Sequence, residues 1–389
     1  MKYRKHRGLS VSEIGVGCYA LSGAYGARDA GGFKQMLRHA FDLGVTFFDT
    51  AEAYGDAERV LGEVVHPYRD EVVIATKVGI REGLTPNLSK EYVHAACTRS
   101  LQQLQTDYID LYQVHFDDPN TPVEETVDAL EELAREGKIR YYGVGHLPVD
   151  RIETYCRVGK PFSVLMELNA AARAAREQLL PLCRKHRLGA IAFSTTGRGL
   201  LTGKIQRDTG FGPDDLRRMD PLFQRERFQS GLRIADRLAA LGKEHGKTPA
   251  QVAIAWVLAQ QGVISALTGP SSIAHLEENV GASGWTPSTR DLTALERFLA
   301  EEEEQLKEEQ QSSLRRILTT ALPQDPAKAL VDLVYVMETA VELGRASEKD
   351  VMPILRELLP MQKALNKSSL AKLQAIRAQL AQLIRLEPS

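Results

Sequence analysis

Four ionisable residues stand at or just past the ends of short apolar runs: Asp49 after VTFF, Tyr54 in the following turn, Lys77 at the end of VVIATK, and His115 after IDLYQV. Apolar runs of this length are typical of parallel strands that are buried on both faces. Tyrosine, with a pKa near ~10, is a weak acid at neutral pH, but an adjacent cation can tune it. The set therefore predicts a proton donor, Tyr54, beside Lys77, with Asp49 holding the lysine charged and oriented.

Similar apolar runs recur along the chain and alternate with amphipathic segments, which predicts a closed (β/α)8 TIM barrel of class α/β. In such a barrel the carboxyl ends of the strands gather one active site. A short N-terminal hairpin is expected over residues 2–12, and residues 202–228 are expected to form a long loop of the kind that often serves as a lid or binding loop. Strands are expected near 14–19, 45–49, 72–77, 109–114, 140–144, 163–167, 189–194 and 263–268. Helices are expected near 33–42, 57–65, 89–104, 124–136, 148–157, 175–186, 229–260 and 272–279.

Strand signals end before about Leu292, so we expect residues 1–285 to form the barrel and residues 286–389 an all-helical C-terminal extension. The apolar stripes of such helices must be buried on something. Packing within the chain, a wall of the substrate site and homo-oligomerisation through the extension all remain open. The helices are expected at 292–311, 314–321, 326–343, 351–359 and 370–386.

Composition excludes several classes of partner. A formal net charge of −2 argues against nucleic acid or an anionic membrane as the main partner, and no apolar run approaches the roughly 20 residues of a membrane span. The basic N-terminus lacks the apolar core of a secretory signal, and the four cysteines show no metal-ligand spacing. We therefore expect a cytoplasmic protein with free thiols and no metal site.

The motifs DTAEAYG, ATK and LYQVH resemble the aldo-keto reductases, and the resemblance covers residues 1 to about 285. It implies an NAD(P)H-dependent enzyme that transfers a hydride between nicotinamide and an aldehyde or ketone, or the matching alcohol. Asp49, Tyr54, Lys77 and His115 would be the catalytic tetrad. Tyr54 would be the general acid and base, and His115 would direct the carbonyl oxygen toward it.

The same resemblance implies a cofactor site with two departures from the family pattern. Gly145 and His146 stand where a serine and an asparagine or arginine usually hold the nicotinamide amide, and Leu165 stands where a glutamine is expected. Phe193 would stack on the nicotinamide, and the matching run RGLLTGK supplies Lys204 as a phosphate cation. The expected cofactor-binding residues are His146, Asn169, Phe193, Ser194, Thr195, Thr196, Gly197, Lys204, Gly269, Ser271, Ser272, His275, Glu278 and Asn279.

Ser271 and Ser272 at a helix start suit an anionic phosphate. The resemblance favours NADPH over NADH, because a serine at position 271 is common in bacterial relatives. However, His275 replaces the common arginine, so the clamp on the 2′-phosphate is expected to be weaker. Substrate contacts are expected from Tyr19, Tyr25 and Phe116, with a small carbonyl or alcohol as the partner.

Two other functions stay open. The barrel could be a nucleotide-binding redox-sensing or scaffold subunit that acts through its helical extension. Alternatively, the altered amide site could hold the cofactor tightly for an internal redox reaction.

Overall fold

The fold is taken from a computed structural model that describes residues 1–24, 29–80, 85–212, 215–218, 220–358, 361 and 365–384. The chain divides into two compact units. The barrel unit comprises Met1–Gln224 and Gly231–Glu296, and the helical unit comprises Arg225–Ser230 and Arg297–Ser389.

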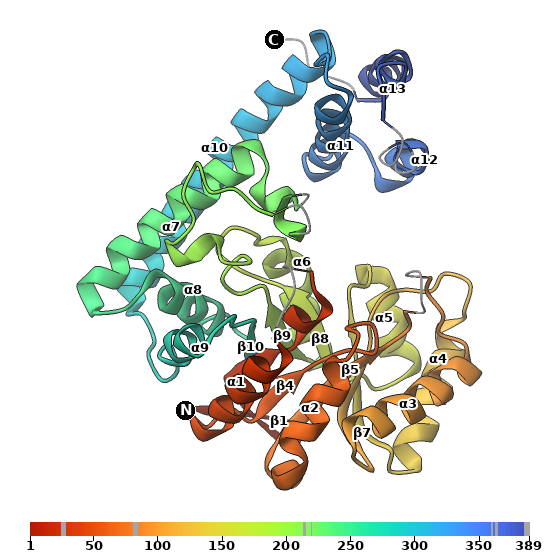
Figure 1. Cartoon of the computed structure of the whole chain (residues 1–389), viewed down its shortest axis with the longest axis vertical. Helices are drawn as coiled ribbons and strands as arrows, with labels where there is room; N and C mark the ends of the chain where they lie inside the picture. Colours follow the sequence, from red (N-terminus) through yellow and green to blue (C-terminus); the bar gives the residue numbers. More distant parts are fainter. Residues whose placement is uncertain are drawn as a thin grey trace. The chain divides into compact units, whose positions relative to one another are not determined.

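Eight parallel strands close into a barrel in the order β10-β3-β4-β5-β6-β7-β8-β9, with helices following the strands along the chain (Figure 1). All eight expected strands are present. Seven of them, all except β7, contain almost only buried residues, which accounts for their largely apolar sequence. The strands are β3 (Ile14–Gly17), β4 (Phe47–Asp49), β5 (Val73–Val78), β6 (Ile109–Val114), β7 (Ile139–Gly145), β8 (Ser163–Glu167), β9 (Gly189–Phe193) and β10 (Val263–Thr268).

The N-terminal hairpin is also confirmed, with β1 (Tyr3–His6) and β2 (Leu9–Ser12) pairing antiparallel. Its turn places Arg7 and Gly8 at positive φ, 42° and 87°, which Gly8 tolerates without strain. Leu9 and Val11 of the hairpin belong to the same buried cluster as side chains from the barrel strands. The hairpin therefore closes the barrel interior at the end opposite the strand C-termini.

Helices α1 to α9 lie near the expected ranges, but α1 begins at Ala30 rather than 33, α7 begins at Arg225 rather than 229, and one expected segment is divided. The segment expected as a single helix over 229–260 forms two, because Gly246 at φ 63° ends α7 and Thr248 begins α8 with a capping box that includes Gln251. The helices are α1 (Ala30–Asp42), α2 (Ala57–Val65), α3 (Lys90–Leu104), α4 (Val123–Arg135), α5 (Val149–Val158), α6 (Ala174–His186), α7 (Arg225–His245), α8 (Pro249–Leu258) and α9 (Ile273–Val280).

The expected long loop is shorter than predicted, because α7 already begins at Arg225. The described residues before it include three 3-10 turns, η4 (Leu200–Thr202), η5 (Leu216–Arg218) and η6 (Pro221–Phe223). One of them is tied to the first loop of the barrel, since the Leu216 amide donates to the Ala24 carbonyl at 2.9 Å.

The helical extension contains α10 (Thr289–Thr319), α11 (Pro326–Glu342), α12 (Glu348–Leu358) and α13 (Ser369–Leu383). The helices predicted at 292–311 and 314–321 are both part of the single helix α10, which continues through residues 311–314 without a break. Mostly leucine, isoleucine and valine side chains from these helices form one buried core, which includes Leu333, Val336 and Leu373. Their apolar stripes are thus buried within the helical unit. Among the described residues, no helix is long and apolar enough to cross a membrane.

Candidate active site

The predicted tetrad converges at the carboxyl ends of β4, β5 and β6. Asp49 is the last residue of β4, Lys77 lies near the end of β5, and His115 directly follows β6. Tyr54 lies in the turn between β4 and α2, a turn that Gly55 permits by adopting φ 57°. Parallel pairing of β4, β5 and β6 brings these positions to one end of the barrel.

Lys77 is the centre of this arrangement and is almost completely buried, with 1% of its surface exposed. Its Nζ donates to Asp49 Oδ1 at 2.5 Å and to the Thr50 carbonyl at 2.7 Å. The same Nζ lies 5.0 Å from the centre of the Tyr54 ring. Burial alone would lower the pKa of Lys77, but Asp49 and Tyr54 outweigh it, so the lysine keeps its charge.

The pKa of Tyr54 departs from the simplest expectation. Burial raises the pKa above the ordinary value of tyrosine, and the positive charge of Lys77 opposes this rise without cancelling it. Tyr54 is therefore a firmly protonated hydroxyl in this structure. That state suits a residue that must donate a proton.

His115 is neutral, because burial and the nearby Lys77 charge lower its pKa to about 2. Its ring lies 5.7 Å from that of Tyr54 in an edge-to-face arrangement. Its buried Nδ1 has no hydrogen-bond partner among the described residues. A buried polar atom without a hydrogen bond costs free energy of desolvation, and a ligand that hydrogen bonds to it would offset this cost.

Aromatic side chains extend the site from His115. Phe116 stacks on His146 with ring centroids 4.7 Å apart, and His146 lies 5.0 Å from Phe193. His146 has φ 50°, an uncommon backbone conformation for a non-glycine residue. Burial, aided by the Lys77 charge, lowers its pKa to about 4.

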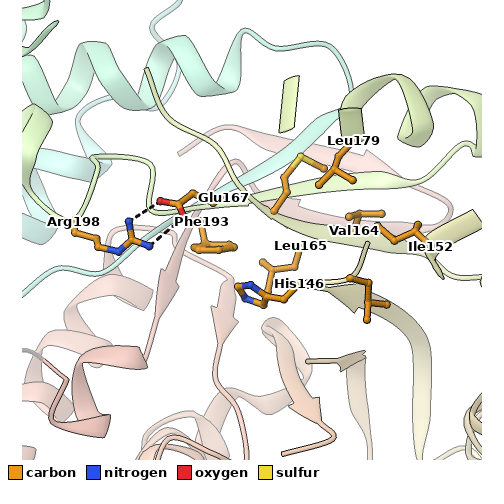
Figure 2. A pocket seen from close by; sticks show the side chains of 10 residues that line it. His146, Ile152, Val164, Leu165, Glu167, Leu179, Phe193 and Arg198 are labelled. Atoms are coloured by element: carbon orange, nitrogen blue, oxygen red, sulfur yellow. Dashed lines mark hydrogen bonds and ion pairs between the residues drawn. The ribbon is translucent and has the colours of Figure 1, made fainter. Parts of the chain in front are cut away.

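His146 and Phe193 border a pocket of about 250 Å³ (Figure 2). Figure 2 shows the Glu167–Arg198 ion pair at one side, aliphatic side chains at the other, and Phe193 between them. The remaining lining residues are Leu147, Ile152, Val164, Leu165, Met166 and Leu179.

The expected substrate residues have separate outcomes. Tyr19 on η1 (Tyr19–Ser22) contacts Tyr54 edge to face, with ring centroids 5.0 Å apart. Phe116 is 38% exposed beside His115. Tyr25 lies outside the described residues.

The loop after β9 contains several of the expected cofactor residues. Ser194 has φ 57° and its buried Oγ has no hydrogen-bond partner among the described residues, whereas Thr195 Oγ1 donates to the Leu267 carbonyl at 3.0 Å. Gly197 at φ 60° and Thr196 continue this turn. Asn169 is committed to the protein itself, since its Nδ2 donates to the Ser194 carbonyl and its Oδ1 accepts two backbone amides.

A second group of expected cofactor residues lies around the start of α9. Ser272 caps the helix by accepting from the His275 amide, and Ser271 Oγ lies 2.8 Å from His275 Nδ1. Gly269 precedes them, and a Cβ placed there would meet nothing within 4 Å. Lys204 and Glu278 form an ion pair with each other at 2.7 Å, and Asn279 is buried on α9.

Two features of the site were not predicted. Gln113, opposite Lys77 in the register of β5 and β6, donates to Asp49 Oδ2 at 3.4 Å. Its signal was a lone amide near the carboxyl end of the strand IDLYQV. The other feature is the cluster of Glu167, Arg198 and Asp220, which depends on loop geometry.

Comparison with known proteins agrees with this geometry. The Aldo/keto reductase family profile matches residues 13–300. Aldo-keto reductase YhdN of Bacillus subtilis is 35% identical over 293 residues, which cover 73% of this chain and 88% of that protein. Probable aldo-keto reductase 1 of Glycine max is 35% identical over 295 residues, which cover 74% of this chain and 85% of that protein.

Solved structures give the same result. Glycerol dehydrogenase AKR11B4 from Gluconobacter oxydans superposes with a TM-score of 0.72 at 28% identity, covering 77% of this chain and 95% of that one. An aldo/keto reductase from Klebsiella pneumoniae in complex with NADP and acetate superposes with a TM-score of 0.60 at 31% identity, covering 75% of this chain and 92% of that one. This chain belongs to the aldo/keto reductase family and is an NAD(P)H-dependent oxidoreductase.

Proposed function

We propose that the protein reduces an aldehyde or ketone with NADPH, or oxidises the matching alcohol, with Tyr54 as the proton donor. The observation that carries this proposal is the buried chain from Asp49 through Lys77 to Tyr54, with neutral His115 beside it. When bound, the reduced nicotinamide supplies a hydride to the carbonyl carbon.

Negative charge then develops on the carbonyl oxygen, and residues of this chain stabilise and neutralise it. Neutral His115 donates a hydrogen bond to that oxygen and stabilises the developing charge. Tyr54 transfers its proton to the oxygen, and the Lys77 cation stabilises the tyrosinate that remains. Asp49 keeps Lys77 charged and in place, since it offsets the effect of burial on the lysine.

The described residues fit the cofactor. Phe193 offers a flat apolar surface next to His146, and Ser194 Oγ, which has no hydrogen-bond partner within the described part of the chain, offers a polar contact in the adjoining turn. We assign the nicotinamide to this region, with His146 as its polar neighbour. The pyrophosphate is assigned to the turn of Ser194, Thr195, Thr196 and Gly197.

The adenosine end is assigned to the start of α9. Free amide groups at a helix N-terminus attract anions, and Ser271, Ser272 and His275 lie there together. We propose NADPH as the preferred cofactor on this basis. Lys204, Gly269, Glu278, Asn279 and Asn169 complete the assignment, with Asn169 acting through the loop that it braces.

Tyr54→Phe tests the mechanism. Loss of a positioned general acid lowers rates by about 10²- to 10⁴-fold, so we expect kcat for aldehyde reduction to fall by this factor. Affinity for NADPH, measured by quenching of the Trp256 and Trp285 fluorescence, should change little.

Tyr108→Phe is the matched control, because it removes one tyrosine hydroxyl that donates to Asp70 and has no role in the assigned site. It should keep kcat within about tenfold of wild type. Equal turnover by Tyr54→Phe and the wild-type enzyme would refute the assigned role. Titrating NADPH and NADH in the same assay tests the cofactor preference, which equal affinities would contradict.

A further inference from the structure

The turn that carries Tyr54 is linked to β5 by hydrogen bonds in both directions. The Thr50 amide donates to the Ala75 carbonyl at 2.8 Å, and the Glu52 amide donates to the Lys77 carbonyl at 3.3 Å. In return, Lys77 Nζ donates to the Thr50 carbonyl at 2.7 Å. The position of Tyr54 relative to Lys77 therefore depends on how this turn is held against β5.

The side chain of Glu52 adds a further link just past the end of β5. Its Oε1 accepts from the Gly79 amide at 2.9 Å and from the Ile80 amide at 3.4 Å. The Glu52 amide already bonds to the carbonyl of residue 77. The backbone and the side chain of Glu52 thus hold the two residues that flank Val78.

Helix α3 completes the surroundings of this carboxylate. Tyr92 Oη lies 3.2 Å from each carboxylate oxygen, and Arg99 Nη2 lies 3.5 Å from Oε2. Burial raises the pKa of Glu52 above the ordinary value of glutamate, and the bonds from Gly79 and Tyr92 oppose the rise. Because both oxygens have donors within the protein, Glu52 is engaged in holding these segments together.

This arrangement matters for catalysis because Tyr54 lies two residues after Glu52 in the same turn. A general acid must stand within hydrogen-bond reach of the atom that it protonates. A misplacement of about 1 Å can lower the rate about 100-fold. The Glu52 carboxylate fixes the Tyr54 turn to β5, the strand that also carries Lys77.

We propose that Glu52 is a positioning residue for the general acid: its carboxylate holds the turn against β5, so that the Tyr54 hydroxyl stays beside Lys77 during proton transfer. Glu52 acts through Tyr54 and does not itself touch the substrate. This inference rests on the proposed function, because it concerns the proton donor assigned there.

Two conservative substitutions separate the reach of the side chain from its charge. Glu52→Gln loses the charge but keeps an oxygen that accepts from the Gly79 amide. Glu52→Asp keeps the charge but is one methylene group shorter, so it withdraws the carboxylate from Gly79. With methyl 4-formylbenzoate and NADPH, Glu52→Asp should lower kcat about 10- to 100-fold, whereas Glu52→Gln should stay close to the wild-type value.

The rates are expressed per nucleotide-binding site, counted by titrating tryptophan fluorescence with NADPH, so that unfolded protein does not contribute. KM and NADPH affinity should change little in both variants. Glu125→Asp is the matched control, because Glu125 Oε1 also accepts from a backbone amide, that of Lys90, at 3.0 Å. This bond involves no residue of the tetrad or of the Tyr54 turn, so kcat should be unaltered.

A double-mutant cycle shows whether Glu52 acts through Tyr54. Tyr54→Phe has already lost the proton donor, so adding Glu52→Asp should lower its residual single-turnover rate by a much smaller factor than in the wild-type background. An equal factor in both backgrounds would overturn the inference. So would wild-type kcat in Glu52→Asp, or a loss in Glu52→Gln as large as that in Glu52→Asp. Turnover by Tyr54→Phe equal to that of the wild-type enzyme would instead contradict the proposed function.

Discussion

Replacing Lys77 with methionine tests the buried ion pair at the centre of the site. Methionine keeps most of the apolar volume of the lysine stem but removes the charge, which leaves the buried Asp49 carboxylate unpaired. The remaining donor to that carboxylate among the described side chains is Gln113 Nε2, at a long 3.4 Å. Removing one partner of a buried pair typically costs about 3–5 kcal/mol, so we expect that loss in the free energy of unfolding at pH 7.

The loss should depend on pH in a defined direction. Burial already raises the pKa of Asp49 in the folded wild-type protein, although Lys77 opposes the rise, and the loss of Lys77 raises this pKa further above its unfolded value of about 3.9. The folded state then binds more protons than the unfolded state between these two pKa values, so the stability of Lys77→Met falls as pH rises through this window. Its deficit relative to the wild-type protein should be smallest near pH 4 and largest at neutral pH.

Urea denaturation followed by tryptophan fluorescence measures this effect, because both tryptophans, Trp256 and Trp285, belong to the barrel unit. The double variant Asp49→Asn, Lys77→Met removes both charges and should recover most of the lost stability. Lys90→Met, which breaks exposed pairs with Asp128 and Glu132, should cost far less stability than Lys77→Met. A double variant no more stable than Lys77→Met would refute the reasoning, because the unpaired charge would not be the cause.

Two further predictions concern His115 and Gly62. Because the pKa of His115 is lowered to about 2, only the unfolded state takes up this proton below about pH 6.5, and the wild-type protein should lose stability as pH falls below that value. His115→Gln should reduce the slope of unfolding free energy against pH by up to about 1.4 kcal/mol per pH unit. An unchanged slope would contradict a neutral buried imidazole. Gly62→Ala on α2 places a Cβ 2.5 Å from the Leu104 carbonyl oxygen, so it should lower the free energy of unfolding, measured by urea denaturation, by about 1–3 kcal/mol despite the better helix propensity of alanine. Gly210→Ala, whose Cβ meets nothing within 4 Å, should be neutral. Equal stability of the two variants would show that α2 and α3 can separate freely.

Much of the barrel could be predicted from the sequence, because its strands are buried on both faces and therefore read as unbroken apolar runs. The tetrad could be expected to converge for the same reason: Asp49, Lys77 and His115 each mark the carboxyl end of such a run. The division of α7 from α8 also had a local signal, the sequence Gly246-Lys247-Thr248-Pro249, which combines a helix end with a helix start.

Other features had no local signal. Arg198 pairs with Glu167 and Asp220 only because a turn with Arg198 at φ 53° brings three distant segments together. The pKa of Tyr54 is raised because burial of the site outweighs the effect of Lys77. The extent of burial could not be predicted from the sequence, which indicated only the nearby lysine. The continuity of α10 depended on Ser312 and Ser313, which are usually weak helix formers; here Ser312 Oγ donates to the Glu308 carbonyl and the helix continues.

Direct transfer of a labelled hydride is the most immediate test of the proposed chemistry. The enzyme would be incubated with methyl 4-formylbenzoate and NADPH that carries deuterium at C4 of the nicotinamide, in separate experiments for the two C4 positions, and the alcohol would be examined by mass spectrometry. We predict one deuterium in the alcohol from one of the two labelled cofactors and none from the other. Reduction without deuterium from either cofactor would contradict direct hydride transfer at this site.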